Sequence, residues 1–177
     1  MKRPCLVLLA LALLSPTLAA RAQSGGAPIE WGVDAAVTIS FDPTVTIVSI
    51  PVSHVRAGFF ITPTFELEPR FGLLSISSSG SRFTQTEFEL GALLHFGDSR
   101  LDTQPYLRPF VGLSSTSTDA DDADDSSTGG TVGVGLGLKI PIGSRFAFRP
   151  EVNYRHLFGD SDDDQLQFLA GFSVYSR

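Results

Sequence analysis

The sequence has 177 residues, a formal net charge of −6 at pH 7 and one cysteine. A chain of this length suits a single domain. Its acidity argues against nucleic acid as a partner, because phosphate contacts require a basic face, and one cysteine cannot form a disulfide framework.

The N-terminal residues predict a signal peptide. Lys2 and Arg3 precede an apolar run that ends in small residues typical of a cleavage site. The run is shorter than the ~20 residues that a membrane-spanning helix needs. Cleavage before Gln23 would remove the only cysteine and leave ten basic against nineteen acidic residues, a net charge of −9. We therefore expect a signal peptide at 1–22 and one exported domain at 23–177, in an envelope protein without disulfides.

After this leader, eight segments alternate apolar and polar residues with a period of two, which is typical of β-strands with one apolar face. The clearest is 131–142, where every even position is apolar and the odd positions from 133 to 139 hold three glycines and Lys139. No segment has a convincing helical period. The eight segments are 29–41, a stretch interrupted by Pro51 that resumes at 55–61, 65–75, 83–96, 105–113, 131–142, 145–156 and 165–175.

The connections between these segments alternate in length. The shorter ones are 62–64, 97–103 and 143–144, and the Ser-rich or Asp-rich loops are 75–82, 114–130 and 159–164. Outer-membrane barrels have short periplasmic turns and longer external loops, and about ten tilted strand residues cross a bilayer. The sequence therefore predicts an all-β fold, an eight-stranded antiparallel up-and-down transmembrane β-barrel.

A soluble lipocalin-like barrel shows the same alternation with its apolar face inside. The membrane barrel is favoured because about five apolar residues per strand exceed what a small interior holds. Lys139 is also the only lysine after the leader, whereas a solvated exterior usually carries more. Aromatic residues near segment ends match membrane-interface girdles, and the predicted interface aromatics are Trp31, Phe41, Phe96, Phe146, Tyr154 and Tyr175.

The polar face carries charges that we expect to pair across the barrel interior, since isolated buried charges are costly. Three arginines adjoin prolines, which belong at β-bulges or irregular pairings, and we expect these sites to aim Arg70, Arg108 and Arg149 inward. Such a small barrel is filled by its own side chains, so we expect no open water channel. The predicted interior network is Asp34, Arg56, Glu66, Glu68, Arg70, Glu87, Glu89, Arg108, Lys139, Arg149, Glu151 and Arg155, six acidic and six basic residues.

Besides the leader and the eight segments, the sequence contains short stretches such as VRAGFF, LEPRFGLL, YLRPFVGL, GLGLKIPI and RPEVNYRH. In these features it resembles small bacterial outer-membrane β-barrel proteins of the OmpA transmembrane domain and OmpX type. The resemblance implies the outer membrane of a Gram-negative-type bacterium, contact with its lipid and lipopolysaccharide, and insertion by the barrel-assembly machinery. Two features depart from the family: no room remains for the peptidoglycan-binding domain of full OmpA, and the sequence ends in Ser176 and Arg177 instead of an aromatic residue.

Two sets of residues suggest chemistry. Acidic clusters in the external loops suggest Ca²⁺ binding or a divalent bridge to lipopolysaccharide, although they lack EF-hand spacing and solvated loops are the simpler interpretation. The weak metal candidates are Asp121, Asp122, Asp124, Asp125, Asp162, Asp163 and Asp164. Ser53 beside His54, and Asp160 near His156, suggest a lipid-modifying acyltransferase or esterase, but no G-x-S-x-G nucleophile motif is present.

The glycines at 133–137 do not form a nucleotide site, because no helix pattern follows them. We therefore expect no catalytic residues and no cofactor. The expected function is a structural or surface-interaction role in the outer membrane, with a salt-bridged interior and acidic external loops. The alternatives are a narrow ion-conducting pore, a lipid-modifying enzyme and a soluble ligand-binding barrel.

Overall fold

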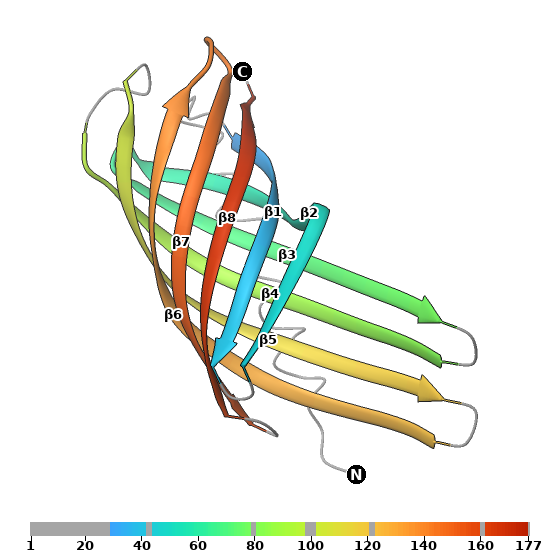
Figure 1. The fold of residues 1–177 in the computed structure, drawn as a ribbon. Coiled ribbons are helices and arrows are strands. Elements are labelled where there is room, and N and C mark those ends of the chain that lie inside the picture. Colours follow the sequence, from blue (N-terminus) through green and yellow to red (C-terminus); the bar gives the residue numbers. More distant parts are fainter. Residues whose placement is uncertain are drawn as a thin grey trace.

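The computed structural model describes residues 29–41, 44–78, 81–97, 102–120, 123–159 and 162–176, so the predicted signal peptide lies outside the described residues. The strands form a closed antiparallel barrel in sequence order, with β1 paired to both β2 and β8 (Figure 1). No helix among the described residues is long and apolar enough to cross a membrane. The strands are β1 (Ile29–Phe41), β2 (Thr44–Thr62), β3 (Phe65–Ser78), β4 (Ser81–His95), β5 (Gln104–Ala120), β6 (Ala123–Pro141), β7 (Phe146–Gly159) and β8 (Asp163–Tyr175).

The strands alternate between a buried inner face and an exposed outer face. In β7, Glu151 and Asn153 are buried, whereas Val152 and Tyr154 are 42% and 48% exposed. Many large apolar side chains are exposed, whereas most of the buried side chains are polar or charged. The soluble lipocalin-like alternative is therefore wrong, because it requires an apolar interior and a polar exterior.

Two of the predicted external loops are largely strand. Residues 75–78 and 81–82 continue β3 and β4, and residues 114–120 and 123–130 continue β5 and β6, which remain paired up to Ala120 and Ala123. These stretches lack an apolar alternation, yet pairing with a neighbouring strand satisfies their backbone N–H and C=O groups. We call the end with these hairpins the outer end, and the end with the β2–β3, β4–β5 and β6–β7 turns the inner end.

The prolines beside the three arginines do not form bulges. Pairing of β3 with β4, β5 with β6, and β7 with β8 runs without a register shift through Pro69, Pro109 and Pro150. In the ladder with the preceding strand (β2–β3, β4–β5 and β6–β7), each proline lies in a gap of two unpaired positions. The register is the same before and after the gap. Proline lacks an N–H, so it removes a ladder hydrogen bond without inserting a residue. These sites are therefore irregular pairings and not bulges, and Arg70, Arg108 and Arg149 point inward as predicted.

The predicted interface aromatics lie on the outer face, with one exception. Trp31, Phe41, Phe96, Phe146 and Tyr154 have between 48% and 60% of their surface exposed. Tyr175 instead lies on the inner face with Ser173, two residues before it, and its ring centroid is 6.4 Å from that of Phe60. Its assignment as an interface aromatic is wrong because the period of two in β8 turns Val174, not Tyr175, outward.

Candidate functional site

The centre of the barrel holds a continuous ion-pair network around Arg149. Its guanidinium lies 3.1 Å from Glu30 Oε1 and 3.2 Å from Glu151 Oε2, and it also pairs with Glu68. The Tyr106 hydroxyl accepts a hydrogen bond of 3.0 Å from Arg149 Nη2. These groups come from β1, β3, β5 and β7, so one arginine ties together strands from opposite sides of the barrel.

The other arginines extend this network on both sides. Arg70 bridges Glu68 at 2.9 Å and Glu151 at 2.7 Å. Arg108 donates to Glu89 at 2.8 Å, and Arg56 donates to Asp34 at 2.6 Å and to the Ser173 hydroxyl at 2.6 Å. All of these side chains are buried, and a charge buried in this way needs a partner to be tolerated.

Glycines on the inner face give these side chains their space. A Cβ at Gly91 would lie 2.9 Å from Arg108 Cζ, and one at Gly32 would meet the Arg56 guanidinium. The glycine-rich inner face of β6 has the same role, because the Tyr106 ring lies against Gly137. A narrow barrel thus holds large charged groups by placing several of them against residues that have no side chain.

All twelve predicted network residues lie inside the barrel and are buried. Glu30 was not among the predicted network residues. It is fully buried and occupies an even position of β1, like Asp34. Among the described residues, the buried interior therefore has seven carboxylates against six Lys and Arg side chains, together with His54 and His95. His54 lies 3.4 Å from Glu87 and His95 lies 3.3 Å from Glu66. The strand alternation was the signal that could have identified Glu30.

A cluster of rings closes the inner end. The His95 ring stacks on Phe60 with centroids 5.7 Å apart and lies 6.0 Å from Tyr106. Beside them Lys139 bridges Glu30 at 2.5 Å and Glu66 at 2.6 Å, with its ammonium 4.9 Å from the centroid of the Phe60 ring. This arrangement fills the lumen at the level of the inner turns.

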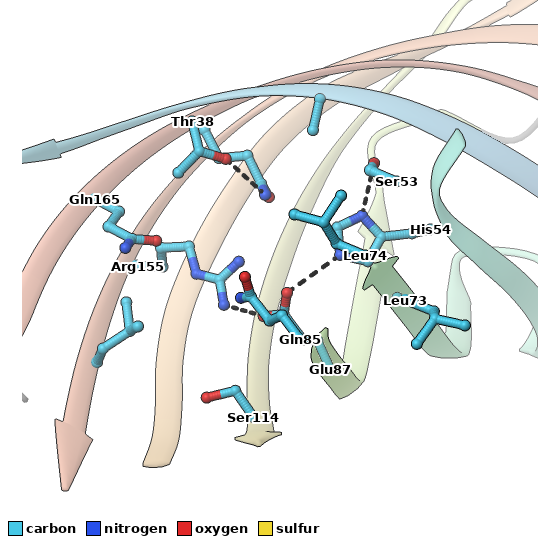
Figure 2. Close-up of a pocket in the computed structure, with 14 residues that line it drawn as sticks. Thr38, Ser53, His54, Leu73, Leu74, Gln85, Glu87, Ser114, Arg155 and Gln165 are labelled. Atoms are coloured by element: carbon cyan, nitrogen blue, oxygen red, sulfur yellow. Dashed lines mark hydrogen bonds and ion pairs between the residues drawn. The ribbon is translucent and has the colours of Figure 1, made fainter. Parts of the chain in front are cut away.

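The outer half of the interior contains a cavity of about 90 Å³. Figure 2 shows a row of polar side chains across it: Ser53, His54, Glu87 and Arg155. His54 Nδ1 is 2.9 Å from the Ser53 hydroxyl, His54 Nε2 is 3.4 Å from Glu87, and Glu87 pairs with Arg155. The Ser53 hydroxyl also lies 3.0 Å from the Asp34 carbonyl oxygen, so its one proton can be donated to that carbonyl or to His54 Nδ1.

The residues proposed for an enzyme are only partly brought together. Ser53 and His54 are in contact, whereas His156 lies exposed near the outer end and pairs with Asp164 at 2.9 Å. Asp160 lies outside the described residues. A serine nucleophile needs a base that takes its proton, and the Ser53 hydroxyl has two acceptors within reach, His54 Nδ1 and the Asp34 carbonyl.

Of the predicted metal candidates, the structure describes the side chains of Asp162, Asp163 and Asp164, and these do not form a converging carboxylate group. Asp121 and Asp122 lie outside the described residues, and Asp124 and Asp125 belong to β6. Asp164 accepts hydrogen bonds from Tyr154 and His156, and Asp163 accepts them from Ser40 and Gln165. The described carboxylates that do converge are Glu30, Glu66 and Glu68. Lys139 and Arg149 already neutralise that group, so the protein supplies its own cations there.

Known structures share this architecture. Neisserial surface protein A (NspA) is 17% identical, with a TM-score of 0.59 over 83% of this chain and 95% of that chain. The N-terminal β-barrel domain of Pseudomonas aeruginosa OprF is 16% identical, with a TM-score of 0.55 over 82% and 97%. Ail, the attachment invasion locus protein of Yersinia pestis, is 12% identical, with a TM-score of 0.54 over 84% and 97%. Identities this low show a shared fold.

The family assignment rests on the sequence. A comparison with curated proteins gives no match. The family model described as "Outer membrane protein beta-barrel domain" matches residues 6–175, nearly the whole chain. The resemblance to small outer-membrane barrels is confirmed, and this chain belongs to the outer membrane protein β-barrel domain family.

Proposed function

We propose that this protein is a surface-interaction protein of the outer membrane, in which a filled barrel holds an acidic β-sheet outside the cell for a basic partner. The observation that carries the proposal is the extension of four consecutive strands past the rest of the barrel. In Figure 1 the outer ends of β3, β4, β5 and β6 project together beyond those of the other strands.

Backbone pairing makes this projection a single sheet. Ser78 pairs with Ser81, Ser81 with Ala120, and Ala120 with Ala123, so the two hairpins are joined through β4 and β5. Pairing of β2 with β3 stops at Gly72, and pairing of β6 with β7 stops at Gly129. The outer edge of β3, residues 73–78, therefore has no ladder pairing with β2 within the described chain. Such edges bind extended segments of other proteins.

The sequence at the tip supports a basic partner. Residues 119–125 contain five aspartates and no Lys or Arg. Opposite charges steer association and favour one class of partner over another. Ail has been crystallised in complex with the heparin analogue sucrose octasulfate. The acidic tip of the present protein supports the opposite preference, for a basic polypeptide over a sulfated one.

A binding experiment tests this function. The protein is placed in nanodiscs and titrated with fluorescent oligolysine, and a variant replaces Asp119, Asp121, Asp122, Asp124 and Asp125 with serine. The matched control is the pair Asp162→Asn and Asp164→Asn in the other acidic region. We expect the five-residue variant to bind at least about tenfold more weakly, a change of about 1.4 kcal/mol, and the control to bind like the wild type. Equal binding by all three proteins would overturn the proposal.

We also propose that the protein reaches this position through its signal peptide and the barrel-assembly machinery, and that it contacts lipopolysaccharide. The charged N-terminus, the apolar run and the family match support this route. N-terminal sequencing of the protein from outer-membrane fractions should begin at Gln23. An intact Met1 in the same fraction would contradict cleavage.

A further inference from the structure

We infer that the line where β2 meets β3, which we call the β2–β3 seam, binds a single-chain amphiphile with a small uncharged head group, such as a monoacylglycerol. The head group would occupy the cavity shown in Figure 2, and the acyl chain would lie in an apolar hollow on the outer surface. This site is independent of the acidic sheet and goes beyond the proposed surface interaction.

The first observation is that the seam is open at its outer end. Backbone pairing between β2 and β3 runs outward as far as His54 and Gly72 and then stops, although both strands continue. Further out, β2 pairs with β1 in a register that shifts between Asp34 and Ala36. Beyond His54 and Gly72, β2 and β3 form no further ladder pair between described residues.

The second observation is that the cavity reaches this opening. Both Leu73 and Leu74 line it, and successive residues of a strand point to opposite faces of the sheet. Leu74 lies beside the His54 ring in Figure 2, whereas Leu73 is on the outer face and 57% exposed. The cavity therefore reaches the barrel wall at the seam.

The chemistry of the cavity indicates the head group. Its charged residues, Glu87 and Arg155, are paired with each other, and His54 also contacts Glu87. Gln85 and Ser114 also line the cavity, and their side chains form no hydrogen bond with other described residues. A volume of about 90 Å³ holds a few water molecules or a head group of glycerol size. These features favour an uncharged group that exchanges hydrogen bonds with amides and hydroxyls.

The third observation lies outside the barrel. An apolar hollow of about 490 Å³ lies over the seam on the outer surface, next to the cavity on the side of the inner end. Ala57 and Pro69 are among its lining residues. The larger side chains of Trp31, Phe71 and Phe172 also line it. Val55 and Phe71, which line the hollow, form the pair next to His54 and Gly72. The hollow thus begins where the cavity ends.

The polarity of the two compartments sets the orientation of the ligand. The polar cavity is at the outer end and the apolar hollow lies toward the middle of the barrel. An amphiphile bound across the seam would have its head group outward and its chain toward the membrane midplane. This is the orientation of lipids in the outer leaflet, so such a ligand can enter sideways from the membrane without turning over.

Trp31 makes this proposal measurable, because it is the only tryptophan in the chain and it lines the hollow. The protein in nanodiscs of saturated phospholipid is titrated with a monoacylglycerol whose chain carries bromine atoms, which quench tryptophan on contact. The control variant combines Trp31→Phe with Leu136→Trp, which moves the tryptophan to the exposed outer face of β6, across the barrel. We expect saturable quenching for the wild type and a linear rise with mole fraction for the control.

Two further variants separate the compartments. Ala57→Phe fills the hollow from the outer face, and Gln85→Leu removes a hydrogen-bonding group from the cavity. Both should remove the saturable component while the proteins still migrate as folded barrels on gels. A brominated fatty acid, which carries a charge, should give only the linear component. Linear quenching of the wild type would overturn the site, and saturable quenching by the fatty acid would overturn the uncharged head group.

Discussion

His54 lies directly opposite Gly72 at the last backbone pair between β2 and β3, and its ring fills the space that a Gly72 side chain would occupy. A Cβ at Gly72 would be 2.9 Å from His54 Cδ2. The imidazole thereby passes over β3 and approaches Glu87 of β4 at 3.4 Å. One side chain thus links three strands at the point where the ladder ends.

Gly72→Val should therefore weaken the barrel at this seam. The added side chain forces the His54 ring away from Glu87, and overpacking of this kind destabilises by about 1–3 kcal/mol. Urea unfolding of the protein in lipid vesicles measures the change. Gly143→Val is the matched control, since nothing lies within 4 Å of a Cβ added there. Equal unfolding free energies for the two variants would contradict the role assigned to Gly72.

Arg149→Leu should lower the stability of the barrel far more than the loss of an arginine outside the network does. The substitution leaves Glu30, Glu68 and Glu151 buried without their shared cation, and breaking a buried pair costs about 3–5 kcal/mol. Arg145→Leu, in the turn before β7, is the control. Unfolding midpoints in urea compare the two, and similar midpoints would show that the network contributes little to stability.

The outer parts of β5 and β6 should exchange their backbone amides slowly. Residues 114–118 pair with both β4 and β6, so their N–H groups are held in a ladder. Hydrogen exchange in detergent micelles, followed by mass spectrometry or NMR, should show protection at 114–118 and rapid exchange at 102–103, which lie outside any strand. Rapid exchange at both sites would instead support the loop that the sequence predicts for 114–130.

The wild-type protein should give no stable single-channel steps in planar bilayers. The Arg149 network and the Phe60–His95 stack occupy the lumen at successive levels. Phe60→Ala combined with Tyr106→Ala removes rings from the inner end and should introduce measurable current. Discrete steps from the wild-type protein would instead favour the narrow-pore alternative.

Sequence reasoning was most successful where the signal is local. A period of two assigns each residue to one face, because successive side chains of a strand point in opposite directions. It therefore placed Arg70 and Glu151 on the polar face and predicted eight strands. The same rule, applied to every position, would have included Glu30 and turned Tyr175 inward.

Other features depend on contacts between distant parts of the chain. Arg149 and Glu30 are 119 residues apart in sequence, and only closure of the barrel brings them together. The pairing gap beside Pro69 and the end of pairing at Gly72 depend on the register of β2 against β3. The period of two does not contain that register, nor does it show that residues 114–120 pair with residues 123–129.

The sequence by itself determined which residues face the lumen and which face the membrane, since that choice follows from alternation within each strand. The tertiary structure decided which charges pair, how far each hairpin extends and where the wall opens at the β2–β3 seam. These outcomes depend on strand register and on distances across the lumen, which exist only once the first and last strands have paired.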